Sequence, residues 1–280
     1  MSGEVQQARQ AMGARLRELR HDAGLTGRAL AQLAGWHPAK VSRLEYGKQA
    51  PSEPDLRTWC QHCRADDQAA DLIATLRNIE AAYLEWKQQL RTGMRRKQKA
   101  SFPLYEQASL VRAYEPALIP GLLQTAAYAH AIMGPYIDLL QIPDDRAEAV
   151  PARMERQRLL YEGGRRFQFV LEEATLRTVV GDPEVMLGQL DRVLAIVSLH
   201  RVSVGIVPEL SARVIWPAEG FLIFDGSTVQ VETVSAQLTI TQPREVAFYL
   251  ETFRRLQLSA RYGEDARELI AHAVKALRAI

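Results

Sequence analysis

The sequence lacks a long hydrophobic run and any segment that resembles a secretory leader. No apolar stretch approaches the ~20 residues that a membrane-spanning helix needs, and the polar residues at the start do not have the pattern of a signal peptide. These absences argue against a transmembrane-helix protein. We therefore expect a cytoplasmic protein.

Cysteine is scarce, and the only two are Cys60 and Cys63, in the sequence CQHC. A structural zinc site needs four ligands, and no second Cys or His pair follows at zinc-finger spacing. Leu56, Trp59, Cys60 and Cys63 fall at helical spacing on one face. We expect both cysteines to be buried core residues, and we expect no metal and no cofactor.

Motifs of common enzyme classes are also missing. The sequence contains no phosphate-binding glycine loop and no Gly-x-Ser-x-Gly nucleophile turn. His130, His200 and His272 are scattered, and we expect His130 to pack near an apolar helix face. Glu172 and Glu173 are adjacent, so their side chains diverge and do not form an acid–base pair by spacing. We expect no catalytic residues and no enzymatic activity.

Charge is distributed unevenly along a chain of ordinary globular composition, with 47% hydrophobic and 24% charged residues. Residues 1–100 hold 17 Lys and Arg against 11 Asp and Glu, whereas residues 101–280 hold 18 against 22. A chain of 280 residues accommodates two domains, each able to bury a core. The basic half suits contact with phosphate groups, and the acidic half does not favour nucleic acid.

Two short amphipathic runs flank one glycine in the stretch 26–47, TGRALAQLAGWHPAKVSRLEYG. Thr26 is a candidate N-cap of the first run, and Gly35 allows the positive φ that ends it. Pro38 suits the first turn of the second run, where its missing N–H costs nothing. Two helices across a tight glycine turn predict a helix-turn-helix.

The second of these helices carries the predicted DNA contacts. Val41 and Leu44 turn inward, which leaves Lys40 and Arg43 outside, where they can donate to guanine O6 and N7 in a major groove. Lys48 lies just past the helix, where a cation meets phosphate. An ordinary helical hairpin with a solvated face is the alternative. The residues predicted to contact DNA are Arg28, His37, Pro38, Ala39, Lys40, Ser42, Arg43 and Lys48.

Two further helices are expected around this pair. In the preceding helix we expect an inner face of Met12, Leu16 and Leu19, and an outer face of Arg15, Arg17 and Arg20. In the following helix, Ser52 and Asp55 form a capping box that opens a run to about Cys63.

This region resembles the Xre-type (lambda-repressor-like) DNA-binding domain from about Met12 to Cys63. The resemblance rests on the segments 16–20 (LRELR), 24–26 (GLT), 30–31 (LA) and 41–48 (VSRLEYGK). In that family the first residues of the third helix and one a turn later read bases, which implies Pro38, Ala39, Lys40 and Arg43 here. Because Pro38 and Ala39 cannot make bidentate base contacts, direct readout falls to Lys40 and Arg43, with apolar contact to a thymine methyl. Gly27 stands where the family often has a phosphate-binding Gln, so that contact is left to Arg28 or to the backbone.

A long helix is predicted from Asp66 to about Leu90 by an apolar stripe with alternating spacings of four and three. The stripe consists of Leu72, Leu76, Ile79, Tyr83, Trp86 and Leu90. It either packs on the core of its own domain, or forms a dimer seam or a strut between domains. The basic run 91–99 is interpreted as a solvated linker, with contact to the DNA backbone as the alternative.

The segment 114–132, YEPALIPGLLQTAAYAHAI, begins with a proline-punctuated loop and continues as a helix capped by Thr125. It resembles the signature "(F/Y)EP…(I/V)PGLLQT…YA" of a large group of actinobacterial regulators, which pair an Xre-type N-terminus with a long C-terminal domain of poorly defined biochemistry. Segments 153–157 (RMERQ), 171–177 (LEEATLR), 181–186 (GDPEVM) and 189–194 (QLDRVL) fit the same group. The resemblance implies a small partner protein, encoded nearby, that binds the C-terminal domain.

The second half alternates predicted strands and helices. Strands are expected at 104–114, 167–171, 202–207, 221–224 and 229–234, and helices at 183–199, 244–258 and 264–279. Asp225-Gly226 is a strong hairpin signal. The fold class is therefore α+β, with an all-α helix-turn-helix domain followed by a mixed α+β domain. The expected domains are 1–65, which binds DNA, 66–100, a connecting helix and basic linker, and 101–280, which is regulatory and binds the partner.

These observations predict a sequence-specific DNA-binding transcriptional regulator that associates with the nucleoid when bound to DNA. One helix-turn-helix reads too few base pairs to be selective in a genome, so we expect a homodimer. Two alternatives stay open. One is an antitoxin-like protein-binding module with autoregulatory DNA binding, and the other is a small-molecule-sensing repressor.

Overall fold

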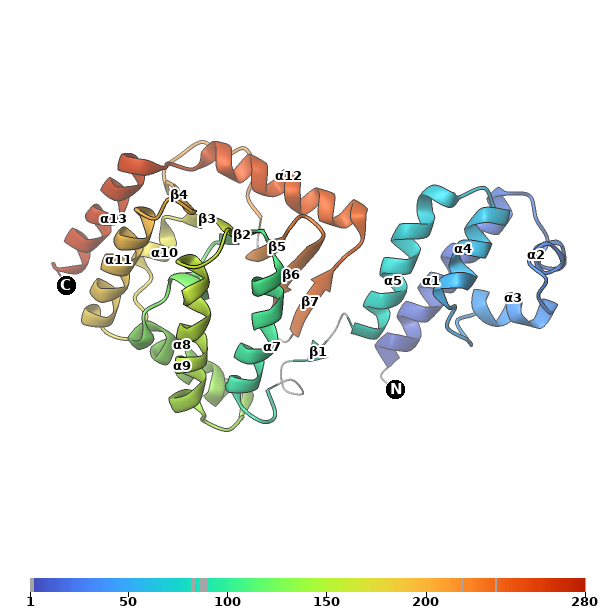
Figure 1. Cartoon of the computed structure of the whole chain (residues 1–280), viewed down its shortest axis with the longest axis horizontal. Helices are drawn as coiled ribbons and strands as arrows, with labels where there is room; N and C mark the ends of the chain where they lie inside the picture. Colours follow the sequence, from blue (N-terminus) through green and yellow to red (C-terminus); the bar gives the residue numbers. More distant parts are fainter. Residues whose placement is uncertain (1–2, 82–83, 86–89, 218, 235, 280) are drawn as a thin grey trace. The chain divides into compact units, whose positions relative to one another are not determined.

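The computed structural model describes residues 3–81, 84–85, 90–217, 219–234 and 236–279. The chain forms two compact units, Met1–Tyr83 with Thr239–Val246, and Leu84–Leu238 with Ala247–Ile280. The first is helical and the second combines helices with a sheet (Figure 1), which confirms the predicted fold class. None of the described helices has both the length and the apolar character that crossing a membrane requires.

Helices that share one core build the described part of the first unit. Leu16, Leu30, Val41, Leu56 and Trp59 lie at its centre, each at most 2% exposed. The Trp59 indole also donates a hydrogen bond to the carbonyl of Leu16 at 3.0 Å. The elements are α1 (Gly3–Asp22), α2 (Gly27–Leu33), α3 (Pro38–Glu45), α4 (Glu53–His62), η1 (Asp66–Gln68) and α5 (Ala69–Ala81).

Cys60 and Cys63 belong to this core, as predicted, and are 0% and 6% exposed. Burial raises the pKa of each thiol to about 11, and at Cys60 the charges of Asp66 and Asp67 add to the effect. The thiols are therefore protonated at neutral pH and pack as small apolar side chains. Within the described ranges, no cluster of three or more His, Cys, Asp or Glu is arranged to hold a metal ion.

The prediction of one helix from Asp66 to about Leu90 is wrong for the second half of that range. α5 ends at Ala81, and β1 (Leu84–Glu85) pairs antiparallel with β7 (Ala236–Ile240). Backbone groups that a continuous helix would satisfy internally are here paired with another strand. A short strand of this kind carries no sequence pattern of its own.

The apolar stripe on which that prediction rested is divided between two cores. Leu72 and Leu76 are buried in the core of the first unit, 6% and 8% exposed. Leu90 is 3% exposed and is buried in the second unit, in a cluster with Met94 and Ala129. The described part of the stripe therefore packs within the chain. Tyr83, Trp86 and the side chain of Ile79 lie outside the described residues.

Most of the basic run 91–99 belongs to α7 (Met94–Gln107) and does not form a linker. Asp145 caps this helix, because its carboxylate accepts hydrogen bonds from the first two helical N–H groups, both at 2.8 Å. The strand predicted from Leu104 is also wrong at its start, since α7 continues to Gln107 and β2 begins at Leu110.

A mixed sheet organises the second unit, in the order β1-β7-β6-β5-β2-β3-β4 among the described strands. β2, β3 and β4 are parallel, with Phe167 aligned to Val111 on one side and Val202 on the other, and β5 is antiparallel to β2 and β6. The predicted strand 202–207 and the hairpin around Asp225-Gly226 are confirmed. The bounds are β2 (Leu110–Glu115), β3 (Arg166–Glu172), β4 (Val202–Val207), β5 (Phe221–Phe224) and β6 (Thr228–Glu232).

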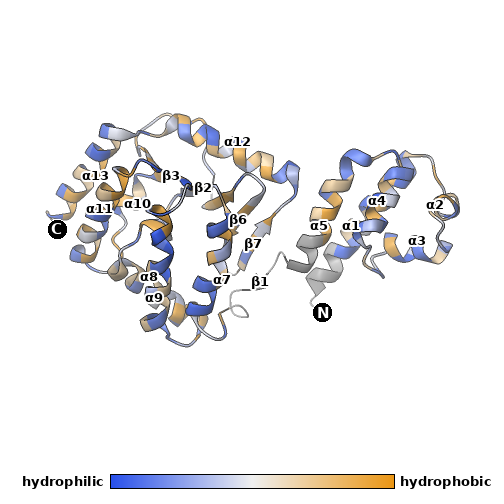
Figure 2. Ribbon diagram, viewed as in Figure 1, coloured by the Kyte–Doolittle hydropathy of each residue, from blue (hydrophilic) through white to orange (hydrophobic). Residues whose placement is uncertain are grey.

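Helices pack against this sheet through amphipathic faces, and Figure 2 shows α12 and α13 banded in apolar and polar residues along their length. α11 and α13 lie side by side next to β4 (Figure 1), and Leu190, Val204 and Ile270 meet in their core. The described helical elements are η2 (Gly121–Leu123), α8 (Ala126–Leu140), α9 (Arg146–Arg156), η3 (Gln157–Leu160), α10 (Ala174–Arg177), α11 (Pro183–Val197), α12 (Pro243–Ser259) and α13 (Gly263–Leu277).

The helix predicted after Thr125 is α8, and the Thr125 hydroxyl caps it by accepting from the backbone N–H of Tyr128 at 3.2 Å. Its buried face contains Ala129 and Met133. His130 follows Ala129 directly and is exposed, so the prediction that it packs against an apolar face is wrong.

Candidate nucleic-acid interface

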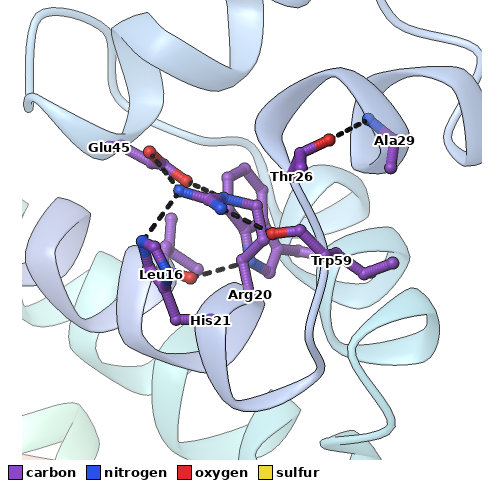
Figure 3. A network of polar contacts seen from close by, with 8 residues as sticks. Leu16, Arg20, His21, Thr26, Ala29, Glu45 and Trp59 are labelled. Atoms are coloured by element: carbon purple, nitrogen blue, oxygen red, sulfur yellow. Dashed lines mark hydrogen bonds and ion pairs between the residues drawn. The ribbon is translucent and has the colours of Figure 1, made fainter.

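The turn between α2 and α3 is fixed by hydrogen bonds that the sequence signals predict. The Thr26 hydroxyl accepts from the backbone N–H of Ala29 at 3.1 Å (Figure 3), which caps α2. Gly35 adopts a φ of +67°, and the N–H of Trp36 donates to the carbonyl of Ala31 at 2.7 Å. This left-handed closure ends α2 and redirects the chain into α3.

The start and the inner face of α3 also match the prediction. Pro38 is its first residue, and the His37 ring caps it, with Nδ1 accepting from the N–H of Ala39 at 3.2 Å. Val41 and Leu44 are 2% and 1% exposed. The opposite face of α3 is therefore turned to solvent, and His37 keeps only Nε2 for a further contact.

Several residues of the predicted DNA-binding set are exposed on or beside this face. Ser42 and Arg43 lie on α3, Lys48 follows it, and Arg28 is exposed on α2. The Arg43 side chain is oriented by Gln49, whose amide oxygen accepts from its Nε at 2.9 Å. This contact occupies Nε, and Nη1 and Nη2 make no hydrogen bond within the described residues.

The side chain of Lys40 is only 24% exposed to solvent. Its Nζ donates to Oδ1 of Asp55 at 2.6 Å and lies 4.3 Å from the centre of the Trp36 ring. Burial opposes ionisation of Asp55, but hydrogen bonds from Lys40 and Ser52 outweigh it and lower its pKa. Lys40 is therefore engaged in an ion pair, whereas Arg43 makes only a hydrogen bond to the neutral amide of Gln49.

Arg20 is buried, and the prediction that it faces outward is wrong. Its Nε and Nη2 donate to the two carboxylate oxygens of Glu45 at 2.6 and 3.1 Å, and its Nη1 donates to the carbonyl of Leu25 at 2.6 Å (Figure 3). Glu45 is the last residue of α3, and Arg20 lies in the last turn of α1. This bidentate pair therefore fixes the end of α3 against α1.

The same two helices approach closely at Gly13. A Cβ atom at this position would lie 2.6 Å from the carbonyl oxygen of Leu44, closer than a side chain tolerates. Glycine thus allows the backbone of α1 to contact the last turn of α3. Together with Arg20 and Glu45, this contact sets the orientation of the exposed face of α3.

One residue beside this face was missed by the sequence analysis. Tyr46 directly follows α3 and is 53% exposed, and the guanidinium carbon of Arg17 lies 5.9 Å from the centre of its ring. An exposed aromatic ring next to a cation at the end of α3 has the chemistry for contact with a phosphate backbone. Its position in the segment VSRLEYGK is the signal that would have found it.

Comparisons with known proteins match both units. Residues 11–73 match a family model described as a helix-turn-helix domain, and residues 102–272 match one described as a domain of unknown function (DUF5753). No curated protein matches the chain. A solved structure of TrmBL2, an archaeal chromatin protein with a novel mode of DNA binding, aligns with 85% of this chain and 88% of its own at 13% identity. The TM-score of this alignment is 0.32.

Proposed function

The chain belongs to the DUF5753 family, and from that premise we propose that it is a sequence-specific transcriptional regulator of the Xre type. In this proposal its N-terminal helix-turn-helix binds double-stranded DNA in the cytoplasm, at the nucleoid, and its C-terminal unit binds a small partner protein. The observation that carries the DNA-binding part is the exposed face of α3, with Ser42 and Arg43 outside and Val41 and Leu44 inside.

Arg43 has the role of direct base readout in this proposal. Arg43→Ala should weaken binding to the preferred site by about 1–3 kcal/mol and remove the preference at one base pair, because a bidentate contact to guanine is lost. The measurement is fluorescence anisotropy on a footprinted operator and on its single-base-pair variants. Arg57→Ala, at an exposed arginine of α4, is the matched control and should leave the preference intact. Equal weakening on every DNA sequence would show that Arg43 contacts only phosphate.

Lys40 has a secondary role in the same proposal. Its ion pair with Asp55 and its contact with Trp36 compete with DNA, so we expect it to add less selectivity than Arg43. A Lys40→Ala/Arg43→Ala double variant that keeps full biological activity would favour the antitoxin-like module over the regulator. In that case DNA binding would be autoregulatory, and holding the partner would be the main task.

Exposed apolar side chains on the second unit support the partner-binding part. Leu210 is 100% exposed and Trp216 is 74% exposed, both in the segment between β4 and β5, and Phe248 on α12 is 73% exposed. Aromatic side chains such as those of Trp216 and Phe248 are enriched at protein–protein interfaces.

Leu210→Ser/Trp216→Ser should abolish co-purification of a small protein encoded next to this chain, and should leave DNA binding unchanged. Loss of a tryptophan anchor costs about 2 kcal/mol or more, which is ~30-fold in affinity. The measurement is co-expression followed by size-exclusion chromatography. Leu139→Ser, at a residue of α8 that is 65% exposed, is the control. Absence of any stoichiometric protein from the wild-type complex would favour the small-molecule-sensing repressor.

We also propose that the chain is a binding protein and not an enzyme. The two adjacent carboxylates of the second unit are engaged in structural contacts, which supports this view. Glu172 accepts from the Tyr114 hydroxyl at 2.8 Å and from Arg213 at 2.6 Å. Glu173 accepts from Arg177 at 2.6 Å and from the backbone N–H of Glu209 at 3.0 Å.

A further inference from the structure

A half-buried and a buried arginine of the second unit, Arg153 and Arg156, lie close together on α9. Arg153 and Arg156 are three residues apart, and Arg156 is 6% exposed. Their neighbours come from α7 and from the loop that contains η2. The sequence segments 153–157 and 120–125, which the sequence analysis singled out but the DNA-binding function does not use, therefore meet at this place.

Every hydrogen bond that these arginines make within the described residues goes to a neutral group. Arg153 donates from Nη1 to the Gln124 amide oxygen at 2.6 Å and from Nε to the Gln98 amide oxygen at 3.2 Å. Arg156 donates from Nη1 to the Ser101 hydroxyl at 2.6 Å, and its guanidinium carbon lies 4.8 Å from the centre of the Tyr105 ring. No described carboxylate is within ion-pair distance of either arginine. A buried charge of this kind is costly unless it is paired.

The edge of Arg156 that best recognises an oxyanion is left without a partner. Its Nε is buried and makes no hydrogen bond within the described residues. Next to it, Nη2 lies 3.3 Å from the point that a Cβ of residue 121 would occupy. A side chain at position 121 would therefore crowd the Nε–Nη2 edge, and glycine leaves this edge uncovered by any side chain of residue 121. This is the edge that forms two parallel hydrogen bonds with a carboxylate or phosphate.

The neighbouring carboxylates only partly neutralise the two arginines. Glu232 pairs directly with Lys97 at 2.9 Å, and its charge also favours the protonated form of Arg153. Burial, with the nearby charge of Glu232, raises the pKa of Glu115 to about 8, so Glu115 is mostly protonated at pH 7. Burial and the like charge of Arg156 lower the pKa of Arg153 to about 10, which still leaves it protonated. Glu232 therefore faces three cations, Lys97, Arg153 and Arg156, and can balance the charge of only one of them.

The loop beside the arginines is held rigidly. Gln157 donates to the carbonyl of Gln124 at 2.6 Å, and Gln189 donates to the carbonyl of Leu123 at 2.8 Å while accepting from the N–H of Thr125 at 2.7 Å. These contacts fix the position of the Gln124 amide that orients Arg153. The side chains of Lys97 and Glu232 are 22% and 59% exposed, so this polar region reaches the surface at Glu232.

We propose that Arg153 and Arg156 form a binding site for a small oxyanion, a carboxylate or a phosphate group of a metabolite. Nε and Nη2 of Arg156 provide a bidentate contact, and Nη2 of Arg153 provides a third donor. The site lies in the second unit and does not depend on the DNA-binding proposal, so each can fail without the other.

The test measures binding of inorganic phosphate and of succinate to the full-length protein by isothermal titration calorimetry and thermal shift. Sodium chloride at equal ionic strength is the reference. At least one of the two anions should bind saturably and raise the melting temperature, and the one that binds identifies the ligand as a phosphate or a carboxylate. Arg156→Met should weaken this binding at least about tenfold, because the bidentate donor pair is lost.

Two further variants separate the site from general charge effects. Arg156→Lys keeps the charge but lacks the planar donor pair, so it should also lose affinity. Arg158→Met, at an exposed arginine two residues further on, should bind as the wild type does. If Arg156→Met does not fold, Arg153→Met and Arg156→Lys test the same contact. The proposal is overturned if neither anion binds beyond the effect of sodium chloride, or if all variants bind equally.

Discussion

Replacing Arg20 with methionine should lower the free energy of unfolding of the N-terminal unit by about 3–5 kcal/mol, because it leaves a buried carboxylate without its partner. Glu45 has a side chain that is 7% exposed, and Arg20 supplies two of its hydrogen bonds. The change also leaves the carbonyl of Leu25 without its donor. Since the pair holds the end of α3, DNA binding should be lost together with stability.

Native-state hydrogen exchange of the α1–α4 amides measures this effect without assuming that the two units unfold together. Arg15→Ala is the control, since its ion pair with Glu18 has side chains that are 44% and 62% exposed. Such a surface pair contributes about 0–1 kcal/mol. The double change Arg20→Met/Glu45→Leu should recover much of the loss, because no buried charge is left unpaired. A loss as small as that of Arg15→Ala would mean that the pair does not hold α3 in place.

The local part of the helix-turn-helix could be predicted from sequence because its signals act within a few residues. Thr26 caps α2 through the N–H of Ala29, Gly35 adopts the positive φ that ends α2, and Pro38 begins α3. Each of these signals involves only residues that are near one another in the sequence. The strand 202–207 was predictable for a similar reason, since its β-branched residues are buried on both faces.

Contacts between distant residues were not predictable in the same way. Arg20 was assigned to the outer face because it is charged, although it follows Leu16 by four positions. Only its pairing with Glu45 explains why a charge is stable on the inner side. Lys40 likewise meets Asp55, which lies on another helix. The arginines of α9 could not be found as a site because their partners, among them Gln98 and Gln124, are neutral and come from separate segments.

Deleting residues 101–280 should leave a folded monomer whose affinity for an inverted-repeat operator is lower by about 10³-fold or more. We propose that the DNA-binding form is a homodimer joined through the C-terminal unit. Two copies then read half-sites about one helical turn apart, ~34 Å. A single copy keeps only one half-site, so its binding approaches the weak, salt-sensitive level of non-specific contact.

The truncated chain should fold because the core of the first unit lies within residues 12–76. It loses the segment Thr239–Val246, and with it the ion pair of Arg244 with Asp71 at 3.0 Å. Arg244 has a side chain that is 63% exposed, so this loss alone should cost little. Arg244→Ala in the full-length chain is the control for that contact.

Analytical ultracentrifugation and anisotropy titrations at two salt concentrations measure both parts of the prediction. Leu72 and Leu76 are buried within the chain, so they are not free to form a dimer seam along α5. This is the reason for assigning the dimer contact to the C-terminal unit. A fragment that is dimeric at micromolar concentration, and that binds the inverted repeat as tightly as the full-length chain, would instead place the seam in residues 1–100. The C-terminal unit would then serve the partner protein alone.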